Sequence, residues 1–157
     1  MVKHESTARF SSVNMPVILA QTDTTVGFLS QNSQKLYRIK SRSNIKPFIK
    51  VYKDFKSFLI EGNRVAKSRR KLVRRSKKTT FIVKNRAFRV AQHSSNSQIL
   101  RDTSWYYSTS ANKSQETFNR EFCETKADII VEDINGLVEK DSSALMKINT
   151  MKRKKIR

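Results

Sequence analysis

Short apolar runs alternate with stretches of helical spacing along most of this chain, and this alternation constrains the fold more than any other feature. Apolar runs bounded by polar residues are typical of buried strands. They predict strands at 16–20, 48–52, 79–83, 87–90, 105–108, 128–131 and 144–148. Helices are predicted at 33–40, 54–60, 63–73, 95–100 and 116–124. Interleaved strands and helices indicate an α/β fold, with a mixed β-sheet and flanking helices.

The length and the cysteine count limit the architecture further. A chain of 157 residues can bury a core as one domain, which we expect at 15–157 after a flexible N-terminal extension at 1–14. The single cysteine, Cys123, excludes an internal disulfide and a cysteine-based zinc site, and two distant histidines suggest no metal site either. No apolar run approaches the roughly 20 residues of a membrane span, so we expect a cytoplasmic protein.

The charge balance points to polyanionic partners. Thirty-three Lys and Arg against thirteen Asp and Glu give a net charge of +20. The segment 64–78 has nine basic residues in fifteen and no acidic one. Such a run is either a solvated basic helix or a surface for RNA phosphates. On the second interpretation, the RNA-binding residues are Arg69, Arg70, Lys71, Arg74 and Arg75.

Two segments far apart in the sequence carry residues suited to a phosphorylated ligand. Residues 21–28 combine three threonines with Gly27, and Lys40-Ser41-Arg42 and Lys46-Pro47 follow them. Residues 108–112 place two serines and a threonine before Asn112. Hydroxyls and paired cations bind phosphate oxygens, and a glycine lets the backbone approach them closely. These segments therefore favour nucleotide chemistry.

These segments and Arg89-Val90-Ala91 occur in the same order as the motifs of the YrdC-like family, the threonylcarbamoyl-AMP synthases. The chain resembles this family from about Met15 to Arg157. The resemblance implies a twisted mixed α/β sheet with a positively lined hollow. It also implies a nucleotidyltransferase that combines L-threonine, bicarbonate or CO2, and ATP with Mg2+. The enzyme releases pyrophosphate and forms threonylcarbamoyl-adenylate, and partner proteins then transfer the threonylcarbamoyl group to tRNA.

The resemblance also assigns roles to particular residues. It implies that Lys40, Arg42 and Ser110 are catalytic. It places ATP against Lys40, Arg42, Lys46, Asn112 and Arg157, and L-threonine against Thr22, Thr24, Arg89, Ser110 and Ser143. The alternative for Arg157 is a frayed basic tail.

Several positions depart from the family pattern. Gln21 and Ala91 each stand in place of a proline, Val26 in place of a tyrosine, and Gln115 where a glycine usually follows the Ser-Ala-Asn turn. The chain is therefore either a minimal synthase or a fold that has lost its chemistry. The alternative function is a non-catalytic tRNA- or RNA-binding module on the same fold.

Overall fold

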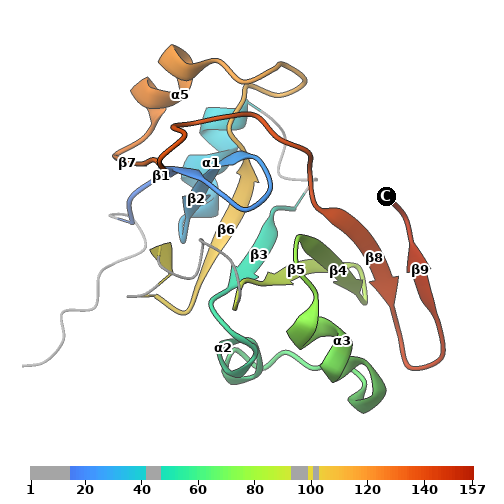
Figure 1. The fold of residues 1–157 in the computed structure, drawn as a ribbon. Coiled ribbons are helices and arrows are strands. Elements are labelled where there is room, and N and C mark those ends of the chain that lie inside the picture. Colours follow the sequence, from blue (N-terminus) through green and yellow to red (C-terminus); the bar gives the residue numbers. More distant parts are fainter. Residues whose placement is uncertain (1–14, 42–46, 93–98, 101–102) are drawn as a thin grey trace, which may run out of the picture.

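The computed structural model describes residues 15–41, 47–92, 99–100 and 103–157. Their strands form one mixed sheet in the order β7-β1-β2-β6-β3-β5-β4-β8-β9 (Figure 1). The pairs β1–β7, β3–β5 and β4–β8 are parallel, and the other neighbours are antiparallel. The strands are β1 (Ile18–Gln21), β2 (Val26–Ser30), β3 (Ile49–Tyr52), β4 (Thr79–Val83), β5 (Arg86–Val90), β6 (Trp105–Ser110), β7 (Ile129–Val131), β8 (Ala144–Ile148) and β9 (Arg153–Lys155).

Short helices connect the strands. They are α1 (Ser33–Lys40), α2 (Phe55–Ile60), α3 (Arg70–Arg75) and α5 (Arg120–Lys126), with a 3-10 turn, η2 (Lys67–Arg69), before α3. A side-chain oxygen caps the start of three of them by accepting from a backbone amide of the first turn. The caps are Asn32 for α1, Asp54 for α2 and Asn119 for α5.

The predicted α/β class and mixed sheet are confirmed, and all seven predicted strands are present. Two further strands, β2 and β9, were not predicted. β2 lies partly within the threonine-rich segment at 21–28, where the polar motif obscured its apolar pattern. β9 consists of three exposed basic residues and so carries no hydrophobic signal.

Two predicted helix starts are wrong. Asn63 does not cap a helix, because its Nδ2 donates back to the carbonyl of Phe58 (3.0 Å) and to the hydroxyl of Tyr52 (2.9 Å). It closes the turn after α2, and helical structure begins only at Lys67. The helix predicted from Glu116 begins at Arg120. Most of the helix predicted at 95–100 lies outside the described residues.

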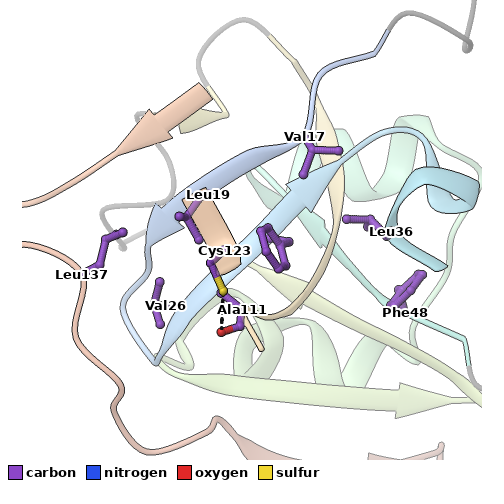
Figure 2. Packing of buried hydrophobic residues seen from close by; sticks show 9 residues of the cluster. Val17, Leu19, Val26, Leu36, Phe48, Ala111, Cys123 and Leu137 are labelled. Atoms are coloured by element: carbon purple, nitrogen blue, oxygen red, sulfur yellow. Dashed lines mark hydrogen bonds between the residues drawn. The ribbon is translucent and has the colours of Figure 1, made fainter. Parts of the chain in front are cut away.

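Side chains of the central strands alternate between two buried layers, as the strand period of two requires. Leu19 and Phe28 join Leu36 of α1 and Cys123 of α5 in one cluster. Figure 2 shows this cluster, in which the Cys123 thiol donates to the carbonyl of Ala111 (3.3 Å). Burial raises the pKa of this thiol, so Cys123 is a neutral packing residue. Leu29 and Val51 point into the opposite layer.

A third cluster lies against α2 and α3 at the other half of the sheet. It joins Phe58 of α2 and Val73 of α3 to Phe81 and Phe88 of β4 and β5. The rings of Phe58 and Phe88 stack with centroids 4.5 Å apart, a geometry that adds to the energy of burial. None of the described helices is both long and apolar enough to cross a membrane.

Asp54→Ala is expected to cost about 1 kcal/mol of stability at neutral pH, because Asp54 accepts the Ser57 amide at 2.7 Å at the start of α2. Burial alone would raise the pKa of the Asp54 carboxyl, but its hydrogen bonds with Ser57 outweigh that effect and lower it. The stabilisation is therefore present at neutral pH and is lost as the pH falls through the lowered value. Urea denaturation across a pH series measures it, with Asp54→Asn as the control that keeps the cap. An equal loss at all pH values would contradict the account.

Candidate functional site

Strand register gathers polar side chains on the sheet face opposite α1 and α5. Gly27 pairs with Ser110, Leu29 with Ser108, and Val51 with Arg89, so these side chains share that face. A cavity of about 420 Å³ opens there. Its lining is rich in hydroxyls and comprises Thr22, Thr24, Thr25, Gly27, Pro47, Phe48, Ile49, Arg89, Ser108, Thr109, Ser110, Ser142, Ser143 and Arg157.

A hydrogen-bonded turn between β1 and β2 forms one wall of the cavity. The Thr22 hydroxyl donates to the carbonyl of Thr25 (2.5 Å), accepts from the amide of Thr24 (3.3 Å), and lies 3.2 Å from the Thr24 hydroxyl. The Thr25 hydroxyl accepts from the amide of Lys140 (3.2 Å), which ties the segment before β8 to this turn. The threonine hydroxyls are therefore held in fixed positions at the cavity edge.

Arg89 is a buried cation paired with the half-buried carboxylate of Asp23. One of its terminal nitrogens, Nη2, donates to both carboxylate oxygens of Asp23 at 2.8 Å, and Nη1 donates to the Thr24 hydroxyl at 3.3 Å. The two charged side chains are only 8% and 13% exposed. A guanidinium has five N–H donors, so these contacts leave donors on Nη1 and Nε for a ligand. Sequence analysis did not assign Asp23, although it lies between the two predicted threonines.

The C-terminal strands supply the opposite wall. Arg157 follows β9, and its backbone pairing with Leu145 (2.9 Å) continues the hairpin to that point. Its Nε and Nη2 donate to the carbonyl of Ser143 at 3.4 and 3.3 Å. The Ser143 hydroxyl is hydrogen-bonded to that of Thr80 (2.7 Å). The alternative of a frayed tail does not describe this segment, because it is paired to β8 and reaches the cavity.

Lys40 joins the end of α1 to the turn after β6. Its side chain is buried, and Nζ donates to the carbonyls of Ser110 (2.9 Å) and Asn112 (2.6 Å) and to the Asn112 side-chain oxygen. The Ser110 hydroxyl lies 3.4 Å away. The structure thus brings two of the sequence motifs into direct contact, with the lysine ammonium engaged by the turn.

The sequence-predicted site residues fall into three groups. Those that line the cavity are Thr22, Thr24, Arg89, Ser110, Ser143 and Arg157. Lys40 and Asn112 lie beside it in the turn contact. Arg42 and Lys46 lie outside the described residues. Thr25, Ser108, Thr109 and Ser142 also line the cavity and were not assigned, since serine and threonine are too common in this chain for single positions to stand out.

The predicted RNA-binding residues lie away from this cavity, on η2 and α3. Arg69 donates to the carbonyls of Asn149 (3.2 Å) and Met151 (3.1 Å), which lie in the turn between β8 and β9. Arg70 is half-buried, and its Nε has no hydrogen-bond partner within the described part of the chain. A separate hollow of about 380 Å³ is lined by the remaining three residues, Lys71, Arg74 and Arg75, together with Gln92.

The structure shows what three departures from the family pattern do locally. Gln21 donates to the carbonyl of Thr22 (3.2 Å) and accepts from the amide of Val138 (2.8 Å). The backbone amide of Ala91 donates to the carbonyl of Tyr52 (2.8 Å), and a proline at this position could not make that bond because it has no N–H. Gln115 has a φ of 66°, in the left-handed region where glycine is least strained. The first two changes add hydrogen bonds, and the third adds strain.

The composition of the cavity defines its ligand chemistry. Its charged lining consists of the two guanidinium groups of Arg89 and Arg157, and its other polar groups are hydroxyls and backbone amides. Among the described residues, no cluster of three or more His, Cys, Asp or Glu side chains could hold a metal. The arrangement suits a small polar ligand that carries negative charge, such as a carboxylate or a phosphate.

Comparison with known proteins supports this fold. No protein-family model matches the chain, and no curated protein sequence matches it. Among solved structures, Sua5 of P. abyssi complexed with L-threonine is similar, with a TM-score of 0.72 and 14% identity over 90% of this chain and 50% of that one. YciO of E. coli has a TM-score of 0.68 and 16% identity over 93% of this chain and 84% of that one. HypF in a phosphate- and nucleotide-bound form has a TM-score of 0.70 and 16% identity over 90% of this chain and 26% of that one.

This chain spans about half the length of the Sua5 chains that it matches. Sua5 and YciO have the YrdC-like fold, and the predicted resemblance to that fold is confirmed. At these identities the likeness establishes the architecture alone.

Proposed function

We propose that the protein is a threonylcarbamoyl-AMP synthase, which makes threonylcarbamoyl-adenylate from L-threonine, bicarbonate or CO2, and ATP, for the modification of tRNA. The observation that carries the proposal is the convergence of the motif segments 21–28, 89–91 and 108–112 on one hydroxyl-lined, cationic cavity. A structural neighbour was solved with L-threonine, and another with phosphate and nucleotide, which supports both halves of the ligand.

The proposed reaction has two bond-forming steps. The amine nitrogen of L-threonine bonds to the carbon of CO2 and loses a proton to solvent, giving a carbamate. A carbamate oxygen then attacks the α-phosphorus of ATP, and the bond from that phosphorus to the β-phosphate oxygen breaks, so pyrophosphate leaves. Catalysis of such a step consists mainly of positioning the reactants and neutralising phosphate charge.

The cavity residues fit the amino acid end of this reaction. Arg89 takes the threonine carboxylate with its remaining donors, while Asp23 fixes the guanidinium plane. Thr22, Thr24, Ser110 and Ser143 supply hydroxyls around the amino acid.

The proposed contacts to the nucleotide are Arg157, Asn112, Arg42 and Lys46. Mg2+ binds as the counter-ion of the nucleotide phosphates. Lys40 is also proposed to contact the triphosphate. Because an ammonium has three N–H donors and Ser110 and Asn112 already engage Lys40, it reaches a phosphate only by giving up one of these acceptors.

The second candidate is a non-catalytic RNA-binding module on the same fold. The net charge of +20 and the basic run at 64–78 favour it. The two candidates differ in a simple way, since the module needs neither L-threonine nor ATP.

Pyrophosphate release tests the proposal. Purified protein with ATP, Mg2+ and bicarbonate is expected to release pyrophosphate only when L-threonine is added, with L-serine as the selectivity control. A rate that does not depend on L-threonine, or no release from folded protein, would reject the synthase.

Gly27→Ala is expected to weaken L-threonine binding about tenfold, because the new methyl group enters the cavity floor and strains its packing. A Cβ at this position would lie 3.0 Å from the backbone carbonyl of Thr109 on β6 and 3.6 Å from the Thr22 methyl group. The KM for L-threonine in the pyrophosphate assay measures the change. Gly62→Ala, which adds the same methyl group outside the cavity where it meets no atom within 4 Å, is the control. An unchanged KM for Gly27→Ala would place the amino acid elsewhere.

A further inference from the structure

Most of the well-exposed large hydrophobic side chains lie beside the two edges of the sheet. Its outermost strands are β7 and β9, and each is paired on one side only within the described ranges. In those ranges seven large hydrophobic side chains are well exposed, and only Ile60 lies elsewhere. The other six are Ile129, Ile130, Ile134 and Val138 in or after β7, and Met151 and Ile156 on either side of β9. Clustered apolar side chains in solvent mark interaction sites.

Both side-chain faces of β7 are open to solvent. Consecutive residues of a strand point to opposite faces, yet Ile129 and Ile130 are 45% and 44% exposed. Ile134 is fully exposed, in the turn closed by the bridge between Asp133 and Gly136. A strand edge with apolar side chains is a template for a further strand. β7 therefore offers backbone hydrogen bonds and apolar contacts to a strand from outside.

The two edges carry opposite charge. The segment 128–139 has four acidic residues and no basic one, although the whole chain has a net charge of +20. The segment 147–157 has six Lys and Arg and no acidic residue, and all three residues of β9 are exposed. Figure 1 shows β7 and β9 at opposite ends of the molecule. The two edges of one copy therefore lie apart, but the edges of two copies are complementary.

Part of the acidic charge beside β7 is not engaged within the molecule. Asp128 lies 3.9 Å from the ammonium of Lys35, and Glu132 pairs with Arg120. Asp133 and Glu139 form no salt bridge with any residue in the described part of the chain. These two carboxylates are available to a basic partner.

Charge also selects which edges can meet. Two β9 edges would bring cations together, and two β7 edges would bring carboxylates together, so a symmetric contact is repulsive. A contact between β7 and β9 pairs opposite charges and places apolar side chains on both sides of the junction. The complementary partner of β7 is therefore β9 of another copy.

We propose that β9 of one copy of this protein pairs with β7 of a second copy and continues the sheet across the contact. The contact joins two different surfaces, so each added copy presents a new edge and association continues beyond the dimer. Strands of three residues bury little area, so the association is weak and depends on concentration. It needs neither L-threonine nor ATP and does not rest on the proposed function.

Sedimentation velocity over a wide range of protein concentration tests the contact. The unaltered protein is expected to form species larger than a dimer as its concentration rises. Ile130→Lys with Ile134→Lys alters the β7 edge and is expected to raise the dissociation constant at least about tenfold, because cations then face the cations of β9. The matched control is Ile60→Lys with Ser68→Lys, which makes the same change in net charge on exposed residues away from both edges.

Met151→Glu with Lys154→Glu alters the β9 edge and is expected to have an effect of the same size. Its matched control is Ile60→Glu with Lys71→Glu, which makes the same change in net charge on α2 and α3. Both controls are expected to associate as the unaltered protein does. A control that loses association as far as its edge variant would reject the edges as the contact.

Mixing the two edge variants gives the sharpest result. Each alone is expected to stay monomeric, whereas the mixture is expected to associate, because β9 of the first variant and β7 of the second are unaltered. A mixture that stays monomeric would reject the pairing of β7 with β9. Association of either edge variant alone would indicate a symmetric contact and would reject it too. Unaltered protein that stays monomeric at every concentration would reject a second copy as the partner.

Discussion

Arg89→Met is expected to lower kcat/KM for L-threonine by at least about 100-fold, the largest effect on activity that the site predicts. A charge-assisted contact to a carboxylate contributes up to about 3 kcal/mol, which corresponds to roughly two orders of magnitude. The control is Arg86→Met, which removes the same charge from an exposed position on the same strand. Kinetics of pyrophosphate release measure both variants. Near-equal losses would show that net charge, and not the Arg89 contact, controls activity.

Arg89→Met also removes the partner of Asp23, which is only 13% exposed. Breaking a buried ion pair from one side costs up to about 3 to 5 kcal/mol, so a loss of activity could reflect a loss of folded protein. The double variant Asp23→Asn with Arg89→Met removes both charges and is expected to recover much of the stability without recovering activity. Recovery of activity in the double variant would show that Arg89 serves the fold alone.

Lys40→Met is expected to cost about 1 to 3 kcal/mol of stability, because the ammonium ties the end of α1 to the turn after β6. Methionine fills a similar volume but leaves the carbonyl of Asn112 without the ammonium donor, whereas the Ser110 carbonyl still accepts from the Asn112 amide (3.0 Å). An unsatisfied buried acceptor costs about 1 to 3 kcal/mol, and relief of the buried charge offsets part of the total.

Urea denaturation measures the loss for Lys40→Met against that for Arg38→Met, on the same helix. Arg38 is exposed, and its replacement is expected to cost less than about 1 kcal/mol. A cost for Lys40→Met no greater than for Arg38→Met would mean that the ammonium does not hold the turn. In that case a direct contact to the nucleotide becomes the better explanation for a lysine at this position.

The sequence was most informative where hydrophobic pattern and structure coincide. The apolar runs around Leu19, Val51 and Phe81 predicted strands that pair in the sheet, and Asn32 marked the start of α1. It was least informative where polar contacts between distant segments decide the structure. No local pattern indicates that Asn63 turns back to Phe58.

The same limit applies to the candidate site. The family resemblance predicted Arg89 and Arg157 as site residues, and both line the cavity. The pairing of Arg89 with Asp23 and the contact of Lys40 with Ser110 could be seen only in the folded structure, which brings these distant segments together. Sequence alone gives the residue types of a site, while the fold determines which of their charges are already engaged.

Mass spectrometry of the reaction product tests the central claim most directly. Protein incubated with ATP, Mg2+, L-threonine and 13C-bicarbonate is expected to yield threonylcarbamoyl-adenylate that carries the labelled carbon, and the product is expected to disappear when L-threonine is left out. Folded protein that forms no adenylate, or an adenylate without the label, would contradict the proposed reaction.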